Sequence, residues 1–574
     1  MKKLRQTLYI PLIYVLMVAC KPTLGTLEIS SIDLATYETD TFDQDFTPVP
    51  IDKTATADVS DYLATVLDTI ETARHVRDLY NAYQIKEEVL HFYQLKNTSV
   101  VWVGEKSTTK EFDELLNLFL NARSHGLNPQ SYDVFKLINL RKQVYEKRNP
   151  NNLALAVLDV RMTIAYMTYA YHMANGSVPP RTLSGLEVGP QIAVAPICAN
   201  NSVSKAIDLL TPQEPAYYQT VAALSKYKTL EKEIIDWDPL PEDLSLEMGD
   251  TSVYVLKMAN RFMQTGDLAK DALVTKDFDS VFVAGVVNFQ RRHGLEPDGV
   301  IGKATIAAYN IPISRKIDML KLNLERMRWL PEDLGDKYII VNIPDYYLNI
   351  FEKGKNTLSM RTIVGKEASQ TPIFREDLEY IVFSPTWTVP PGIVRDEILP
   401  KLRADNQYLI KRGYKLYPDW QEDSEPLESD KIDWNSVNPE TITYRVVQDP
   451  GPSNALGLVK FIMPNSVNIY LHDTPSDYLF NRSERAFSHG CIRLEYPDKL
   501  AAYLLKDLKG WDEEAIAEAM NQKEPKTVLL SEKLPVYLVY RSAWGDETGL
   551  VQFRKDIYEY DSESNFEKYT TLAD

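Results

Sequence analysis

Cysteine is scarce in this sequence of 574 residues, which contains only Cys20, Cys198 and Cys491. No CxxC pair and no HExxH motif occurs, so the sequence lacks the common spacings of zinc ligands. If Cys20 is chemically modified, only Cys198 and Cys491 remain as thiols, and they could pair as a disulfide. The alternative is that one of them is a reactive thiol.

Positive charge is also in short supply. The sequence has 63 Lys and Arg residues against 81 Asp and Glu residues, a formal net charge of −18. Such a chain repels polyanions instead of neutralising a phosphate backbone, so nucleic acid is excluded as an expected partner. The hydrophobic content of 44% and charged content of 25% are those of a folded protein.

The N-terminal apolar run from Leu8 to Ala19 is shorter than the ~20 residues that span a bilayer. It follows a basic start and ends on a small residue before Cys20, which is typical of an export signal. The segment resembles a bacterial lipoprotein processing site, and this resemblance implies a lipid anchor on Cys20 and a periplasmic location in a Gram-negative bacterium. A plain signal peptide and an uncleaved anchor are the alternatives.

The length predicts three or more domains, because single cores seldom exceed about 200 residues. Changes in composition and periodicity divide the chain into successive segments. They are a signal peptide over 1–20, a flexible tether over 21–60, a helical scaffold over 61–240, a small helical module over 249–312, a mixed β-rich domain over 336–561 and a polar tail over 562–574.

The module over 249–312 combines Phe289-Gln290, Asp298-Gly299 and Thr305 in a pattern that closely resembles the three-helix peptidoglycan-binding module of bacterial wall enzymes. The resemblance implies a wall-binding role. A plain helical bundle that only braces its neighbours is the alternative.

The predicted chemistry lies in "YLHDTP", which ends a strand at His472, and in "SHGC", which ends at Cys491. A thiol acts as a nucleophile only as thiolate, so it needs a neighbouring base or a positive field. Gly490 permits close backbone approach, and the amides of Gly490 and Cys491 are candidate oxyanion donors. A zinc site that draws its ligands from His472, Asp473, His489 and Cys491 is a weaker alternative.

These motifs closely resemble the catalytic signature of the L,D-transpeptidases, and the segments "VGKEASQTPIF" and "PTWTVPPGIVRDEILPKL" resemble the large periplasmic, multidomain branch of that family. The resemblance implies that Cys491 is the nucleophile and His472 the general base and acid. The donor would be a stem tetrapeptide of peptidoglycan, and a second stem would be the acceptor. No metal or other cofactor is implied, and carbapenem-type β-lactams are expected inhibitors.

Four other residues and one insertion are candidates for supporting roles. His489 is expected to support the site, and Arg493 to meet a substrate carboxylate; a salt bridge within the loop is its alternative. Trp387 and Tyr470 match cleft positions of the family, although both could belong to the core. An insertion over 393–443 is a candidate lid. The same site could release D-alanine to water as an L,D-carboxypeptidase, and a non-catalytic wall tether is the rival from another class.

Overall fold

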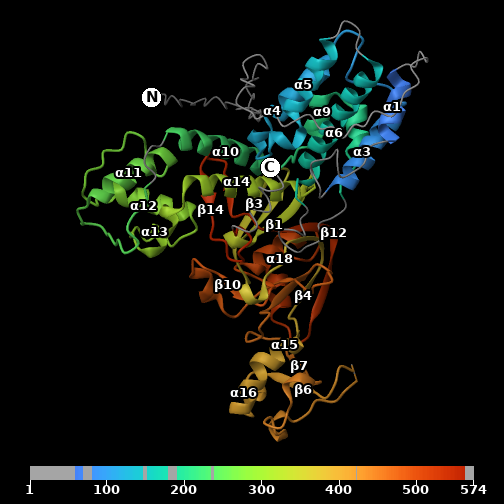
Figure 1. Cartoon of the computed structure of the whole chain (residues 1–574). Coiled ribbons are helices and arrows are strands. Elements are labelled where there is room, and N and C mark those ends of the chain that lie inside the picture. The colour runs from blue at the N-terminus through green and yellow to red at the C-terminus, as the bar shows by residue number, and fades with distance from the viewer. Residues whose placement is uncertain are drawn as a thin grey trace, which may run out of the picture.

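The computed structural model describes residues 59–68, 81–146, 151–178, 191–233, 238–331, 333–421 and 423–562 (Figure 1). The predicted signal peptide, Cys20, and nearly all of the predicted tether and tail lie outside these residues. The described chain forms a helical N-terminal domain, a three-helix module on one side, a β-rich domain, and an insertion at the far end of the β-rich domain (Figure 1). This arrangement confirms the expected multidomain α + β class.

The helical N-terminal domain is organised around one long helix. Its α-helices are α1 (Val59–Asp68), α3 (Ala82–Leu95), α4 (Lys110–Leu120), α5 (Val134–Tyr145), α6 (Asn152–Asn175), α8 (Ala195–Asn200) and α9 (Val203–Leu210), with the 3₁₀ turns η3 (Ala122–His125) and η4 (Pro129–Tyr132). Asn151 caps the N-terminus of α6, because its side chain accepts a hydrogen bond from the Leu153 amide. The helix ends at Gly176, which has a φ of 83°.

Helix α6 is apolar and long enough to span a membrane by length and composition alone. However, 78% of its most apolar stretch is buried inside the protein. The other helices surround it, and they share one hydrophobic core with it. A helix that is apolar on all sides is expected at the centre of a bundle, and α6 holds that position here.

A joint of two helices and a hairpin connects the helical domain to the β-rich domain. Helices α10 (Pro215–Glu233) and α14 (Ile313–Arg328) pack against each other and against β13 (Ala543–Gly545) and β14 (Val551–Phe553). A Cβ at Gly545 would lie only 2.2 Å from the Gln219 carbonyl oxygen, so glycine permits this close approach. The C-terminal hairpin therefore ties the end of the chain to its middle.

The three-helix module contains α11 (Val253–Thr265), α12 (Ser280–Arg292) and α13 (Lys303–Asn310). Gln290 explains much of its sequence signature. The side chain of Gln290 donates to Asp298 Oδ1 over 2.8 Å and accepts from the Gly299 amide over 2.9 Å. Gly299 has a φ of 73°, a left-handed conformation that suits glycine. The quoted signature is therefore accounted for by the folding of the turn between α12 and α13.

The β-rich domain is built on a closed ring of strands. The strand order is β10-β3-β11-β9-β8-β4-β12-β1-β2, and the additional pairing of β2 with β3 closes the ring from β3 to β2, with β10 added beside β3. The strands are β1 (Lys337–Asn342), β2 (Tyr347–Glu352), β3 (Lys355–Gly365), β4 (Phe374–Phe383), β8 (Val459–Ile462), β9 (Leu471–His472), β10 (Ala486–Ser488), β11 (Ile492–Leu494) and β12 (Lys526–Val539). Helices α18 (Pro497–Leu505) and α19 (Glu513–Met520) share its core.

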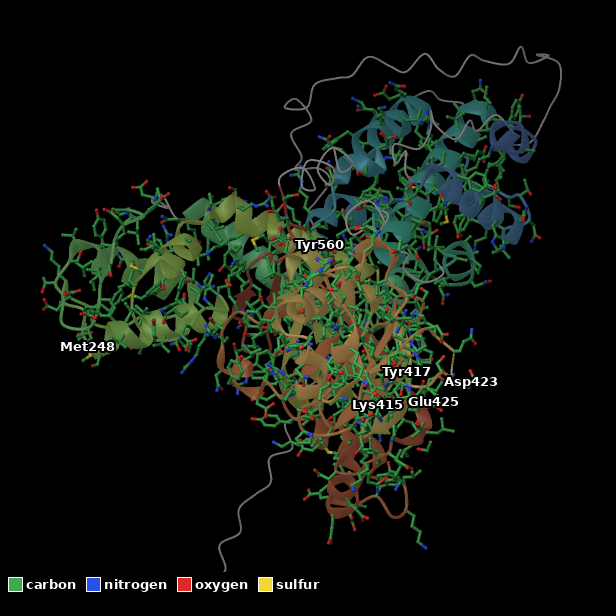
Figure 2. The ribbon with its side chains drawn as sticks, turned by 90° about the horizontal axis from the view of Figure 1, so that it is seen from below. Met248, Lys415, Tyr417, Asp423, Glu425 and Tyr560 are labelled. Atoms are coloured by element: carbon green, nitrogen blue, oxygen red, sulfur yellow. The ribbon has the colours of Figure 1, made fainter. Side chains whose placement is uncertain are left out.

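The insertion between β4 and β8 folds around a core of its own. It contains β5 (Trp387–Thr388), α15 (Pro391–Ile393), the π-helical turn η7 (Val394–Ile398), α16 (Leu399–Ala404), α17 (Tyr408–Lys411), β6 (Tyr414–Tyr417) and β7 (Arg445–Gln448). The last three strands named form a small sheet in the order β5-β7-β6. Lys415, Tyr417, Asp423 and Glu425 label this part of the chain in Figure 2, far from Met248 of the three-helix module.

The π-helical turn η7 ends at Ile398, two residues before Pro400. Proline cannot donate a backbone hydrogen bond, and its ring displaces the preceding turn. A widened turn is one way for a helix to accommodate this residue. The turn carries Glu397, which faces the catalytic motif described below.

Candidate active site

Two parallel strands bring the two predicted motifs together. β9 pairs with β11 so that Leu471 lies opposite Ile492 and His472 opposite Arg493. Leu471 and Ile492 are fully buried in the core of the β-rich domain. Because successive side chains of a strand alternate between the faces of a sheet, His472 and Arg493 lie on the opposite face.

The same alternation places Tyr470 and Cys491 beside them. Tyr470 is two residues before His472, and the Ile492 amide donates to the Tyr470 carbonyl over 3.1 Å. Cys491 therefore stands across from Tyr470, and His472 is its diagonal neighbour. The rings of Tyr470 and His472 are 5.7 Å apart. The structure thus gathers four of the predicted site residues on one face.

The turn that carries Cys491 is held by side chains on both sides. Gly490 has a φ of 113°, a conformation that L side chains rarely adopt. Its amide donates to Ser488 Oγ over 3.1 Å, and its carbonyl accepts from Thr371 Oγ1 over 2.7 Å. Ser488 Oγ donates in turn to the Cys491 carbonyl over 2.6 Å. The Gly490 amide is thus already engaged, and in this conformation Gly490 supports the turn.

His472 is arranged as a neutral base. Its Nδ1 lies 2.5 Å from the Asp473 carbonyl oxygen. A carbonyl can only accept, so this contact assigns the proton to Nδ1 and leaves the lone pair on Nε2. Burial, followed by the positive charges of Arg493 and Lys460, lowers the pKa of His472 to about 3. The imidazole is consequently uncharged at neutral pH.

The Cys491 thiol is influenced by opposing effects. Burial raises its pKa, whereas the Tyr470 backbone and hydroxyl, Arg493 and Lys460 lower it. The thiol lies 3.7 Å from the Asn468 carbonyl, to which it donates. Since burial dominates, the resting cysteine is a neutral thiol beside a neutral imidazole. The cations are placed to stabilise a thiolate once it forms.

Asp473 has a structural task here. Its Oδ2 accepts from the Leu458 amide and its Oδ1 from the Thr474 amide, each over 2.7 Å. A Cβ at Gly457 would lie 2.3 Å from the Asp473 side chain, so the loop before β8 wraps closely around this carboxylate. Asp473 therefore fixes the loop next to His472, and its oxygens are occupied by backbone amides instead of a metal ion.

His489 connects the catalytic turn to the insertion. Its Nε2 lies 2.7 Å from Glu397 Oε1 on η7 and 3.3 Å from Lys366 Nζ. All three side chains belong to different segments of the chain, so the contact joins the insertion to the β-rich domain. This partner of His489 was not foreseen, because nothing in the sequence around Glu397 indicates it.

Trp387 is placed differently from the other predicted residues. It lies on β5, and its ring centroid is 6.3 Å from that of Tyr414 in the sheet of the insertion. It packs partly buried against the core of the insertion. The contacts described for it are with the insertion, and not with Cys491 or His472.

The two cysteines of the described chain are both free. Cys198 is buried in α8 of the helical domain, whereas Cys491 belongs to the β-rich domain. The alternative of a disulfide between them is therefore wrong. Burial raises the pKa of Cys198 to about 12, which makes it an inert core residue.

Sequence reasoning missed three residues that shape the site. Lys460 on β8 pairs in register with His472. The Tyr558 hydroxyl donates to the Gly365 carbonyl and accepts from the Thr371 amide, behind the catalytic turn. Alternation along "LVKFIM" could have placed Lys460 on the polar face of its strand. No local signal points to Thr371 or Tyr558.

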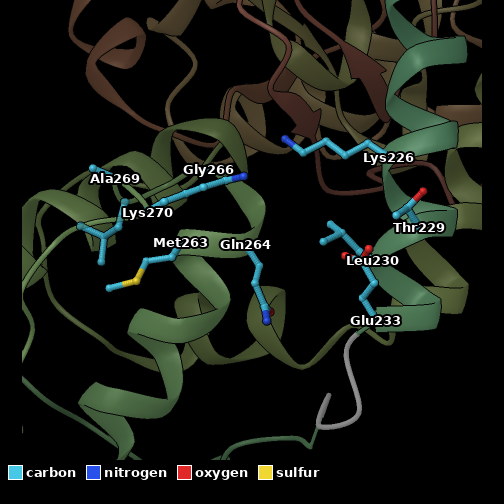
Figure 3. Close-up of a pocket in the computed structure, with 10 residues that line it drawn as sticks. Lys226, Thr229, Leu230, Glu233, Met263, Gln264, Gly266, Ala269 and Lys270 are labelled. Atoms are coloured by element: carbon cyan, nitrogen blue, oxygen red, sulfur yellow. The ribbon is translucent and has the colours of Figure 1, made fainter.

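A separate concavity lies between α10 and α11 (Figure 3). It has a volume of about 510 Å³ and is lined by Lys226, Leu230, Met263 and Lys270 among others. It lies at the junction of the joint and the three-helix module. The candidate catalytic residues therefore do not line it.

Comparison with known families assigns three parts of the chain. Residues 336–522 match YkuD, the L,D-transpeptidase catalytic domain, residues 87–224 match a scaffold domain, and residues 260–308 match the family described as "Putative peptidoglycan binding domain". Tyr470, His472 and Cys491 all fall within the first of these matches.

Known proteins agree with this assignment. The chain is 37% identical over 258 residues to a Haemophilus influenzae protein named "Putative L,D-transpeptidase", an alignment that covers 44% of this chain and 51% of that protein. The chain thus spans about half the length of this curated relative.

Solved structures with detectable similarity include an L,D-transpeptidase from Mycobacterium smegmatis. It is 12% identical, with 35% of this chain and 58% of that chain covered at a TM-score of 0.18. An L,D-transpeptidase from Xylanimonas cellulosilytica is 14% identical, with 52% and 99% covered at a TM-score of 0.15. The comparison therefore rests on the sequence matches. It shows a chain whose residues 336–522 are similar to the L,D-transpeptidase catalytic domain and which also carries regions similar to a scaffold domain and to a peptidoglycan-binding domain.

Proposed function

We propose that this protein crosslinks peptidoglycan by a cysteine-dependent L,D-transpeptidase reaction. The observation that carries the proposal is the placement of Cys491 and His472 on one face of neighbouring strands, inside the region that matches the catalytic domain. Tyr470 stands beside both of them. A wall-binding tether has no need of this combination.

In the first half-reaction, His472 takes the proton of Cys491 as the sulfur attacks the carbonyl at the L-centre of diaminopimelate in a donor tetrapeptide. A C–S bond forms, and the C–N bond to the terminal D-alanine breaks. The proton passes from His472 to the departing nitrogen, so D-alanine leaves as a neutral amine. A thioester remains on Cys491.

In the second half-reaction, a side-chain amine of an acceptor stem attacks the thioester. His472 accepts a proton from that amine as the new C–N bond forms, and the C–S bond breaks to regenerate the thiol. The product is a diaminopimelate-to-diaminopimelate crosslink. Water in place of the amine would give an L,D-carboxypeptidase on the same residues.

The negative charge that develops on the attacked oxygen requires hydrogen-bond donors. The Gly490 amide is engaged by Ser488. The Cys491 amide and the Tyr470 hydroxyl are therefore the donors that we assign to this oxygen. Tyr470 is supported in that role by its contact with the Cys491 side chain.

The test is incubation of the purified protein with disaccharide tetrapeptides, followed by mass spectrometry of the products and of the protein. Dimers, free D-alanine and a Cys491 adduct are expected, with and without a chelator. D-alanine without dimers would replace the proposal by the carboxypeptidase. If a folded protein forms neither dimers nor free D-alanine, the result would favour a non-catalytic tether. The same spectra, taken with a carbapenem, test the expected acylation of Cys491.

The remaining proposals concern location. The N-terminal sequence supports export to the periplasm and lipidation of Cys20. Fractionation of cells that express the wild type and the Cys20→Ser variant tests this. Retention of the wild type with membranes and release of the variant are expected. Equal distribution of the two would contradict the lipid anchor.

A further inference from the structure

A row of three basic side chains crosses the strands at the site. Lys460 on β8 lies opposite His472 on β9, and His472 lies opposite Arg493 on β11. Partners in register share a face of the sheet, so all three side chains stand on the face that carries Cys491. Adjacent strands are about 4.8 Å apart, which puts the two cationic residues roughly 10 Å apart at the backbone. Side chains of their length reach across the imidazole from both sides.

Neither cation has a carboxylate partner within the described part of the chain. Arg493 Nε is buried and has no hydrogen-bond partner. The groups that act on the charge of Arg493 are Cys491 and Tyr478, while Lys460 is acted on by Cys491 and lies with its Nζ 5.9 Å from the centroid of the Tyr470 ring. Both pKa values are lowered by burial. Two half-buried cations without an anion between them form an unsatisfied arrangement.

Other arginines of the same domain are well paired. Arg361 binds the Glu495 carboxylate, and Arg485 donates to the Arg482 carbonyl over 2.7 Å and to the Tyr346 carbonyl over 3.1 Å. Arg493 Nε differs from these two guanidinium groups, because it is buried and has no hydrogen-bond partner. An anion that arrives with the substrate would complete the row.

We propose that Lys460 and Arg493 together hold the carboxylate of the terminal D-alanine of the donor stem, with Lys460 as a specificity-determining residue. This inference rests on the proposed function and names the group that the site recognises. The carboxylate is two bonds from the nitrogen that leaves, and His472 delivers the proton to that nitrogen. A carboxylate that is bound by cations from both sides of His472 therefore brings the departing nitrogen close to the imidazole.

The arrangement predicts a requirement for a free carboxylate directly after the scissile bond. An amidated C-terminus carries no charge for the two cations, and an additional residue moves the charge away from them. Arg493 offers a planar fork and Lys460 a single point charge, a combination that binds one carboxylate from two directions. Burial, together with the charges of Arg493 and Lys460, keeps His472 uncharged at neutral pH by lowering its pKa to about 3.

The test compares two donor substrates, the tetrapeptide with a free C-terminal carboxylate and the same tetrapeptide with a C-terminal amide. Each is assayed with the wild type, Lys460→Met and Lys460→Arg, and with Lys533→Met as a matched control. Lys533 lies exposed on β12 of the same ring of strands, where it pairs with Glu379. Release of the C-terminal residue is measured as kcat and KM, and melting temperature confirms folding.

We expect amidation to lower kcat/KM of the wild type and of Lys533→Met by about 10- to 100-fold, the worth of hydrogen bonds to a charged group. In Lys460→Met this penalty should shrink to a few-fold, largely through a raised KM for the free acid. Lys460→Arg should restore it in part. An unchanged penalty in a folded Lys460→Met protein would overturn the proposal.

A second measurement separates carboxylate binding from thiol tuning. The rate of Cys491 alkylation by iodoacetamide is followed against pH in the absence of substrate. If Lys460→Met shifts this profile upward while the amide penalty stays at its wild-type size, Lys460 acts on the thiolate alone and the proposal is wrong. If the wild type turns over neither substrate, the proposed function itself fails, an outcome distinct from loss of discrimination.

Discussion

Two groups of buried charge in this protein differ in how they are satisfied. At the joint of the three-helix module, Arg292 and Asp267 are almost completely buried and face each other. Arg292 Nη2 donates to Asp267 Oδ2 over 2.6 Å, and Nη1 donates to the Val551 carbonyl over 3.2 Å. At the active site, Lys460 and Arg493 are buried to a lesser degree and meet no carboxylate among the described residues.

The difference distinguishes a structural charge from a functional one. The Asp267 carboxylate also accepts from Thr265 Oγ1 over 2.6 Å, so the joint is saturated with hydrogen bonds. Such a cluster holds α11, α12 and β14 in one arrangement, and nothing is left for a ligand. The active-site row keeps its bonding capacity free. Stability is therefore expected to depend on the joint and turnover on the row.

The largest expected effect is on turnover, at the cysteine beside the row of basic side chains. Replacing Cys491 with Ala removes the nucleophile and should lower crosslinking and D-alanine release by at least about a thousandfold. The melting temperature should stay close to that of the wild type, because no ion pair or packed core residue is lost. Mass spectrometry of the products checks the expected loss of turnover, and calorimetry checks the expected melting temperature. Wild-type release of D-alanine by the folded variant would refute the assignment of Cys491.

The joint should show the reverse behaviour. Asp267→Asn leaves the buried Arg292 without its counter-charge, which typically costs about 3–5 kcal/mol of unfolding free energy. Chemical denaturation measures the loss, and Asp271→Asn on the exposed loop nearby is the control. Turnover per folded molecule should be retained. A variant as stable as the control would show that the pair contributes nothing to the joint.

The pH dependence of turnover should reflect the low pKa of His472. The imidazole acts as base in its neutral form, which dominates above a pKa of about 3. We therefore expect kcat/KM to lose its base only as the pH falls towards 3, and not near the ordinary value of about 6.5. Folding must be monitored in parallel. An acid limb near pH 6.5 in folded protein would contradict the buried, cation-flanked environment.

Stability should begin to change at a higher pH, for a related reason. The unfolded chain protonates His472 below about pH 6.5, whereas the folded state resists protonation down to about 3. The contribution of this residue to stability is thus present above about 6.5 and declines as the pH falls towards 3. His472→Gln should show a shallower loss than the wild type over that window.

The smallest effect is expected at the contact between the insertion and the catalytic turn. His489 and Glu397 are about one-third exposed, so their pair is worth at most about 1 kcal/mol. Glu397→Gln should change kcat/KM by only a few-fold, because a pair exposed to this degree is weak. Asp396→Asn on the same turn is the control. A loss as large as that of Cys491→Ala would mean that Glu397 has a chemical role.

Local patterns were sufficient for much of the architecture. The helical pattern predicted over residues 61–240 and the change to a β-rich pattern after residue 336 both identified the correct class of structure. The quoted motifs also placed His472 at the end of a strand and Cys491 in a glycine turn, because each motif is only a few residues long. The motifs did not predict that the Gly490 amide would be engaged by Ser488.

The sequence by itself determined the order of the helical and β-rich regions and singled out the thiol and the imidazole that we propose as nucleophile and base, since these depend on short stretches of chain. Only the tertiary structure decided which groups surround them. Lys460 meets His472 through strand register, Glu397 reaches His489 from 92 residues away, and Tyr558 braces Thr371 from 187 residues away. Contacts of this kind arise from the closure of the sheet and the return of the C-terminal segment, and no local pattern encodes them.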